Sequence, residues 1–365
     1  MASTTFLRLA VLGILSLTCF QNAEGAELSL AEAVAKADGK YLDVPEVGHG
    51  GETPQTVVGG GEESAGPSET ENAQVPLKVT LTYVEEQPQE EETPDADADL
   101  DETPLGESGE AAGPLRAPVV TVYFDGPAAP TSGDGGETTP AGSKVVAKLE
   151  SDSAGFADPP VSVQIAELDP RNPYPEVVVS FFTGGAHCCS VTSVVTSNKD
   201  GSEWKTVDVG EFDGGPLLSV DLDGDGRYEF ETRDNAFLYA FGCYACSEAP
   251  LQVLALEDGK IEDVNADPRF KPAHAAWLKT MIVGVPDADV NGFLAGYVGE
   301  KIRLGEGKEA WALMLDYYDK DSDMGLETCD QPLNDDGECP GETVMLSFPD
   351  ALERMLKENG YKVEK

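Results

Sequence analysis

The middle of the chain alternates short apolar runs with turn residues. From Pro118 onwards, runs rich in Val, Ile, Phe and Tyr are separated by Gly, Pro, Asn and Asp, and Asp-Gly pairs recur at 125–126, 200–201 and 258–259. Short strands joined by such turns are typical of antiparallel sheets. The pattern therefore predicts a β domain over residues 118–271.

A helical period replaces this pattern in the last part of the chain. Trp277 and Met281 are four positions apart and share one face of a helix. Asn291 suits the N-cap of a second helix, and Pro349 suits the first turn of a last one. We therefore expect a small helical subdomain over residues 272–365.

The β domain contains an internal repeat over residues 165–210 and 219–264. Each copy has acidic residues around a tight loop, a strand, a glycine-cysteine segment ending in Cys-Ser, a strand, an Asp-Gly turn and a final strand. Glu167 in the first copy corresponds to Asp221 in the second. A period near fifty residues with about four strands per unit is typical of propeller blades or stacked sheets.

Two units cannot close a propeller, which usually takes at least about four blades. Residues 118–161 supply at most a third, degenerate sheet. The predicted fold is mainly β with α: antiparallel propeller-blade-like repeats, arranged as an incomplete propeller or a sandwich, followed by the helical subdomain.

The region before the β domain is acidic. From about Val44 to Ala117 it is rich in Glu, Asp, Pro, Gly, Ser and Thr, and its basic residues are Lys78 and Arg116. Such a segment buries too little apolar surface to offset its chain entropy. Residues 27–117 are therefore predicted to be an acidic, mostly disordered region.

Two short segments interrupt this region. Residues 29–41 read as a helix-like opening, and residues 76–86, "PLKVTLTYVEE", alternate apolar and polar positions as a strand does. The strand either docks on the folded domain or stands alone.

The first residues and the net charge bear on location and ligands. Residues 1–26 carry one arginine, an apolar run of about twelve residues and then small residues, the layout of a cleaved secretory signal. Cys19 lacks the small residue directly before it that a lipid-attachment site has, which favours a signal over a lipid anchor. No later segment is apolar enough to span a bilayer. We expect a periplasmic or secreted protein.

The formal net charge is −44, from 68 acidic and 24 basic residues. A chain this acidic repels phosphate backbones and anionic lipid surfaces, which argues against nucleic acid or peripheral membrane binding. Cations and basic partners are the natural ligands.

The stretch "DLDGDGRYEF", residues 221–230, is the clearest candidate for chemistry. Alternating carboxylates on a tight loop point at one centre, and calcium takes six to eight oxygen ligands. We predict calcium binding by side chains and, for the arginine, by the main-chain carbonyl: Asp221, Asp223, Asp225, Arg227 and Glu229. Three close carboxylates repel one another without a cation. The alternative is an acidic hairpin turn without metal.

This loop is not an EF-hand. An EF-hand has helical flanks and a bidentate glutamate at its twelfth place, whereas here that place is Thr232 and the flanks read as strands. "SVDLDGDGRYEF" instead resembles the calcium loop of FG-GAP and VCBS-type repeats, the blade units of integrin-like propellers. Their Asp-x-Asp-x-Asp-Gly-x-x-Asp/Glu pattern is matched position by position, which implies a calcium-binding blade.

A broader resemblance covers residues 118–365. "FTGGAHCC", "DGDGRYEF" and "FGCYACS" are similar to an uncharacterised family of exported proteobacterial proteins, which implies no known activity. One copy of the loop departs from the pattern. There Glu167, Asp169, Asn172 and Glu176 fill a loop that is one residue longer and holds three prolines, which disfavours metal binding.

Six cysteines follow the signal: Cys188, Cys189, Cys243, Cys246, Cys329 and Cys339. An even number in an exported chain predicts disulfide bonds and an oxidising compartment. Cys188 and Cys189 are too close for easy bonding to each other, so we expect each to pair with Cys243 or Cys246. Two alternatives stay open, namely zinc held by this cluster with His187 and a redox dithiol of Cys243 and Cys246.

The last two cysteines, Cys329 and Cys339, lie close enough in the sequence to staple a loop of the helical subdomain. No catalytic motif stands out. The histidines after the signal are His49, His187 and His274, and no nucleophile elbow, His-Glu-x-x-His helix or phosphate-binding loop is present.

The sequence thus favours an exported, non-enzymatic calcium-binding protein with a structural or interaction role in the cell envelope. Its other partner would be a protein or a glycan. The alternatives are a periplasmic enzyme, either a hydrolase with an acidic cleft or a thiol oxidoreductase, and a zinc-binding protein that uses the His/Cys cluster.

Overall fold

The structure is a computed structural model of the 365-residue chain. It describes residues 28–45, 56–59, 68–71, 76–85, 114–126, 143–156, 159–185, 188–331, 334 and 338–365, without the side chains of residues 56–59, 68–71 and 188. The predicted signal over residues 1–26, most of the acidic region, His49 and His187 lie outside the described residues.

Thirteen of the described strands form three antiparallel sheets, each built on a four-stranded meander. The first comprises, in this order, β2 (Ser68–Glu71), β3 (Leu77–Glu85), β4 (Arg116–Phe124) and β5 (Lys144–Glu150). The second comprises β6 (Val161–Ala166), β7 (Glu176–Phe182), β8 (Cys188–Ser197) and β9 (Trp204–Asp213), with β1 (Thr56–Gly59) added beside β6. The third comprises β10 (Ser219–Val220), β11 (Glu229–Arg233), β12 (Leu251–Glu257) and β13 (Lys260–Asp263).

The predicted repeat is confirmed, because its two copies are the second and third meanders, with the same strand order. The first meander is the third sheet that the sequence suggested. It begins earlier than residue 118, since the predicted strand at 76–86 is β3 and pairs along its whole length with β4.

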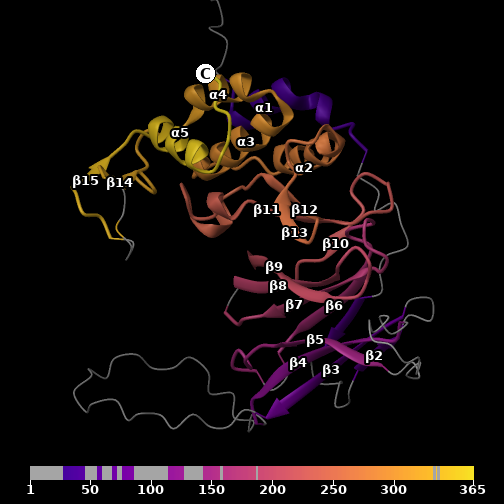
Figure 1. Ribbon diagram of the computed structural model, residues 1–365. Coiled ribbons are helices and arrows are strands. Elements are labelled where there is room, and N and C mark those ends of the chain that lie inside the picture. Colours follow the sequence, from indigo (N-terminus) through magenta and orange to yellow (C-terminus); the bar gives the residue numbers. More distant parts are fainter. Residues whose placement is uncertain are drawn as a thin grey trace, which may run out of the picture.

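The meanders stack as layers, and the described strands do not close into a ring. Figure 1 shows the first meander at the bottom, the third beside the helices and the second between them. The middle sheet is buried on both faces: Val177 and Val179 of β7 face the first meander, while Val178 between them faces the third. Gln164 links the second and third layers through hydrogen bonds of 2.8 Å with the main-chain N–H and carbonyl of Ser219.

The C-terminal part is helical, as predicted. Its elements are α2 (Lys271–Val283), α3 (Val290–Leu304), α4 (Gly307–Tyr317), α5 (Phe348–Glu358) and a hairpin of β14 (Glu327–Cys329) and β15 (Thr343–Met345). Helix α2 covers the outer face of the third meander, where Phe270 and Ala273 pack against Leu251 and Val253. None of the described helices has an apolar stretch long enough to cross a bilayer.

The prediction that Asn291 caps α3 is wrong by two positions. The N-cap is Asp289 and the helix starts at Val290, so Asn291 lies inside the first turn. Its side chain is buried and hydrogen-bonds the main chain of Asp319 in both directions, at 2.9 and 3.0 Å, which ties α3 to the loop after α4.

The helix predicted near residues 29–41 is present as α1 (Leu30–Asp38). Ser29 and Glu32 form a capping box that fixes its start. Leu30 and Val34 enter the core formed by the C-terminal helices. Residues 28–45 therefore belong structurally with a part of the chain that lies far away in the sequence.

Candidate metal centre

The turn between β10 and β11 gathers the three predicted aspartates. Val220 pairs with Glu229 across the hairpin, so the acidic loop begins directly after one strand and ends at the other. One carboxylate oxygen from each of Asp221, Asp223 and Asp225 lies within 4.8 Å of the others. This separation suits oxygens that share one cation.

The loop is wound around Asp221. Its Oδ1 accepts hydrogen bonds from the N–H groups of Gly224 at 2.7 Å and Asp225 at 3.1 Å, and its Oδ2 accepts one from Gly226 at 3.1 Å. Both glycines have a left-handed backbone, with φ of 77° and 86°, which side-chain-bearing residues rarely adopt. The main chain thus holds the acidic centre in shape.

Glu229 lies beneath the loop and is completely buried. Its Oε2 accepts the N–H of Leu222 at 3.3 Å, whereas its Oε1 has no hydrogen-bond partner among the described residues. Burial raises the pKa of Glu229 to about 7, and the nearby charges of Asp223 and Asp225 act in the same direction. A buried acceptor without a partner is costly, and a cation in the loop would remove that cost.

A cationic side chain already lies against the open side of the loop. The Nη1 of Arg269 is 3.1 Å from Asp223 Oδ2 and 3.3 Å from Asp225 Oδ2, while its Nε donates to Asp267 at 3.0 Å. Arg269 belongs to a short 3₁₀ turn, Pro268–Phe270, that leads into α2. Sequence reasoning missed this residue, since only the packing of α2 on the third meander brings it to the loop.

Arg227 joins the two repeat loops. Its Nε donates to the carbonyl of Leu168 and its Nη2 to the carbonyl of Leu256, both at 2.8 Å. The side chain therefore anchors the loop from behind. The predicted role of its carbonyl as a ligand stays a prediction.

In the equivalent loop of the second meander, the buried glutamate is hydrogen-bonded within the protein. Glu176 starts β7 as Glu229 starts β11, and it is also completely buried. Its Oε2 accepts the N–H groups of Leu168 and Asp169, and its Oε1 accepts Asn172 Nδ2 at 2.5 Å and Thr196 Oγ1 at 2.9 Å.

Asp169 in this loop is also occupied by the protein itself. It forms a two-point contact with Arg171, at 2.6 and 2.9 Å, and its Oδ2 accepts the N–H of Asp258 at 3.0 Å. These bonds lower the pKa of Asp169 although burial raises it. In the first-copy loop, Asp169 and Glu176 are therefore bonded within the protein, although Glu167 Oε1 is buried without a partner among the described residues, as Glu229 Oε1 is in the second-copy loop.

The cysteines form disulfides, but not in the predicted pattern. Cys243 bonds Cys246, with a Cα–Cα distance of 4.9 Å. The prediction that these two pair with Cys188 and Cys189 is wrong, because the 3₁₀ turn Tyr244–Cys246 folds the Cys-x-x-Cys segment back on itself. Cys189 is disulfide-bonded as well.

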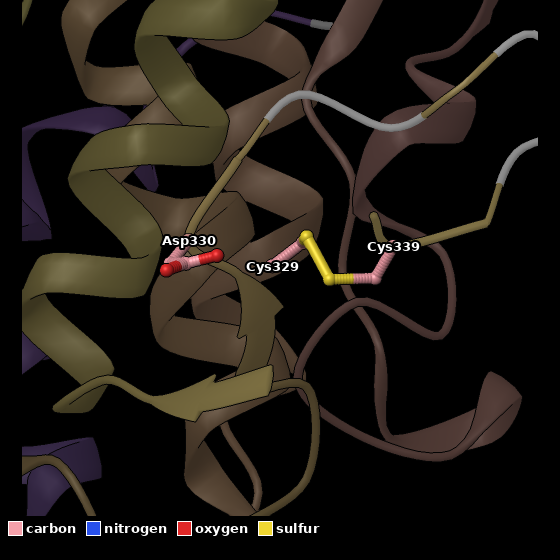
Figure 2. Close-up of side chains that lie close together, drawn as sticks. All are labelled: Cys329, Asp330 and Cys339. Carbon is pink, nitrogen blue, oxygen red and sulfur yellow. A yellow bond between two sulfur atoms is a disulfide. The ribbon is translucent and has the colours of Figure 1, made fainter. Parts of the chain in front are cut away.

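Cys329 bonds Cys339, as predicted, at the base of the β14–β15 hairpin. Figure 2 shows this bridge with Asp330 beside it. The three residues lie close enough to share an ion, but sulfurs in a disulfide are not thiolates and do not bind zinc. The Cys329–Cys339 disulfide therefore crosslinks this segment covalently. Asp330 beside it accepts a hydrogen bond from the N–H of Glu342 at 2.9 Å.

Comparison with known proteins finds a family match for part of the chain and two relatives. Residues 273–360 match a family described as "sll0997 C-terminal domain". The chain is 43% identical over 223 residues to a probable thylakoid lumen protein, sll0997, of Synechocystis, covering 60% of this chain and 65% of that protein. It is 34% identical over 227 residues to the uncharacterised protein y4bJ of Sinorhizobium fredii, covering 60% of this chain and 36% of that protein.

The chain thus spans less than two thirds of the length of either relative. No solved structure matches it significantly. The similarity to uncharacterised proteins agrees with the broader resemblance seen in the sequence. The family match covers the helical part and leaves the Asp221 loop outside it, so the FG-GAP and VCBS likeness of that loop stays a resemblance.

Proposed function

We propose that the chain is an exported protein whose third meander binds one calcium ion in the Asp221 loop. The ligands are the side chains of Asp221, Asp223, Asp225 and Glu229 with the carbonyl of Arg227. The observation that carries the proposal is the buried Oε1 of Glu229, which has no hydrogen-bond partner among the described residues and lies in the loop of three clustered carboxylates. Glu176, which has the same position in the other repeat, has both oxygens hydrogen-bonded, and the described residues of that loop form no such carboxylate cluster.

The ion serves a structural role in this proposal. Extracellular calcium modules bind at about 0.1–1 mM, which suits an ion that stays bound rather than one that signals. The loop lies between the third meander and the turn that leads into α2, so calcium stiffens the join between sheets and helices. The module then acts in a cell envelope or lumen as an interaction protein, with a protein or glycan ligand.

Export has three supports. The first residues have the layout of a signal, the cysteines whose side chains are described are in disulfides, and a similar chain is named as a probable thylakoid lumen protein. A lumen and a periplasm both lie across a membrane from the site of synthesis, and both suit disulfides.

We also propose a division into a signal (1–26), an acidic region (27–117), a β-repeat domain (118–271) and a helical subdomain (272–365). Two pieces of the acidic region are assigned to the folded parts. Residues 28–45 supply α1 to the helical core, and residues 68–71 and 77–85 supply β2 and β3 to the first meander.

Calcium titration followed by thermal melting tests the proposed function. At 10 mM calcium the melting temperature is expected to rise by about 3–10 °C, because a ligand at ten to a hundred times its Kd stabilises by about 1.5–3 kcal/mol. Magnesium at the same concentration serves as the control ion. An unchanged melting temperature, or a rise that persists in Asp223→Ala, would contradict the proposal.

Arg269→Ala is expected to tighten calcium binding about threefold to tenfold. The guanidinium competes for Asp223 and Asp225, and one charge at about 4 Å in a water-exposed site is worth roughly 1 kcal/mol. Isothermal titration calorimetry measures the change. The exposed neighbour Lys271, replaced by alanine, is the matched control, and an Arg269→Ala protein that binds more weakly would refute the competition.

A further inference from the structure

The Cys243–Cys246 bridge lies in an accessible position. It belongs to the connection between β11 and β12, where Cys243 is exposed and Cys246 is half-buried. Both cysteines line a hollow of about 320 Å³ whose apolar lining includes Phe241, Val290 and Met324. A sulfur on the rim of such a hollow can be reached by the side chains of another protein.

The turn that carries the bridge is held without it. The N–H of Cys246 donates to the carbonyl of Cys243 at 3.0 Å. Ser247 Oγ donates to that carbonyl at 2.9 Å and accepts the N–H of Tyr239 at 3.1 Å. A bridge between residues three positions apart closes a very short loop and removes little chain entropy. Opening it therefore leaves the turn in place.

Helix α3 supports the same turn. A Cβ on Gly292 would lie 2.4 Å from the carbonyl oxygen of Cys246, so the first turn of this 15-residue helix packs directly on the cysteine segment. The positive end of a helix favours a thiolate nearby. Asp289 and Asp319, which also line the hollow, act in the opposite direction.

We propose that Cys243 and Cys246 form a thiol–disulfide exchange site for protein dithiols. A thiolate of the partner attacks Cys243 Sγ, the Cys243–Cys246 bond breaks, and Cys246 leaves as a thiolate that takes up a proton. The second partner thiolate then attacks the partner's own sulfur in the mixed disulfide and releases Cys243. The partner gains one disulfide, and its two electrons reduce the cysteine pair. This site does not depend on calcium binding.

The Cys329–Cys339 bridge provides an internal reference. Cys329 is buried, with 7% of its surface exposed, and its bridge closes a longer loop. The full chain is equilibrated with reduced and oxidised glutathione in varied ratio, then alkylated and mapped by peptide mass. Cys243–Cys246 is expected to open at a glutathione ratio at least tenfold less reducing than Cys329–Cys339 requires. Opening of both bridges at the same ratio overturns the proposal.

A trapping experiment tests the partner step. Cys246→Ser is expected to form a stable mixed disulfide through Cys243 with a synthetic peptide that carries a single cysteine, as Cys-x-x-Ser, in oxidised glutathione buffer, because neither molecule then has a second thiol to resolve it. Cys339→Ser leaves the buried Cys329 and is expected to trap none. Equal trapping by the two variants, or none by a Cys246→Ser protein with native circular dichroism, overturns the proposal. Should that variant not fold, the glutathione measurement on the wild-type chain decides.

Discussion

Replacing Lys301 with methionine is expected to lower the free energy of unfolding by about 3–5 kcal/mol. Lys301 and Asp38 are 2% and 1% exposed, and Nζ lies 2.5 Å from Asp38 Oδ1. The hydroxyl of Tyr297 donates to the other oxygen of Asp38, also at 2.5 Å. Without the lysine, Asp38 would remain as a buried charge with no cationic partner. Urea denaturation followed by circular dichroism measures the loss.

Lys40→Met is the matched control for this change. Lys40 pairs with Glu306, which Lys301 also contacts, but its side chain is 57% exposed. An exposed pair contributes about 1 kcal/mol or less. The double variant Asp38→Leu with Lys301→Met removes both buried charges and is expected to recover most of the stability. Similar losses for Lys301→Met and Lys40→Met would show that the buried pair contributes no more to the free energy of unfolding than the exposed pair does.

The buried pair explains why the N-terminal helix folds with the C-terminal ones. Asp38 and Lys301 are 263 residues apart in the sequence. Tyr41 adds a second contact, because its hydroxyl donates to Glu306 at 2.9 Å. The family match begins at residue 273 and so does not include α1. The described helical core is nevertheless incomplete without it.

Local patterns predicted the elements well, because the spacing of apolar residues reports which face of a strand or helix is buried. The alternation in residues 76–86 identified β3 inside an acidic region whose average composition suggests no structure. The repeat predicted two sheets with the same strand order. Whether sheets stack or surround an axis depends on the angle between neighbouring layers, and no residue pattern within one layer fixes that angle.

The candidate site was predictable only in part. The spacing of Asp221, Asp223 and Asp225 fixes their convergence, since all three lie on one tight loop. Arg269 could not be predicted, because it is 46 residues from Asp223 and reaches it only through tertiary packing. The predicted pairing of Cys243 and Cys246 was wrong because of a local feature. The repeat suggested long-range partners for these cysteines, whereas the 3₁₀ turn between them brings them close enough to bond each other.

The stability of the calcium-free protein is expected to fall as the pH rises from about 4.5 to about 7. Burial raises the pKa of Glu229 and of Glu176 from 4.5 to about 7. In that interval the folded state holds protons that the unfolded state has released, so a higher pH favours unfolding. For each residue the penalty is complete above pH 7 and corresponds to roughly 3 kcal/mol, since one pKa unit equals about 1.4 kcal/mol.

Calcium is expected to reverse the effect of ionisation on stability for Glu229 but not for Glu176. An ion in the loop favours the ionised carboxylate, so the residue that destabilises the calcium-free protein at pH 8 becomes a ligand. Glu229→Gln is therefore expected to stabilise the calcium-free protein by about 1–3 kcal/mol at pH 8. The same variant should lose the gain of about 1.5–3 kcal/mol that 10 mM calcium gives the wild type. Urea denaturation at pH 8, with calcium or with chelator, measures both differences.

Glu176→Gln separates burial of a carboxylate from binding of an ion. Glu176 has the same position in its repeat and the same raised pKa, but both its oxygens are hydrogen-bonded within the protein. The glutamine removes the charge penalty but keeps only one of the two acceptor oxygens, so this variant is expected to gain less stability at pH 8 than Glu229→Gln, and its response to calcium should match the wild type. Loss of the calcium response in both variants would mean that the two buried glutamates act only through the fold. Loss in Glu229→Gln alone would mean that the ion binds at the Asp221 loop, because Glu229 belongs to the loop with the three clustered aspartates and Glu176 belongs to the other repeat.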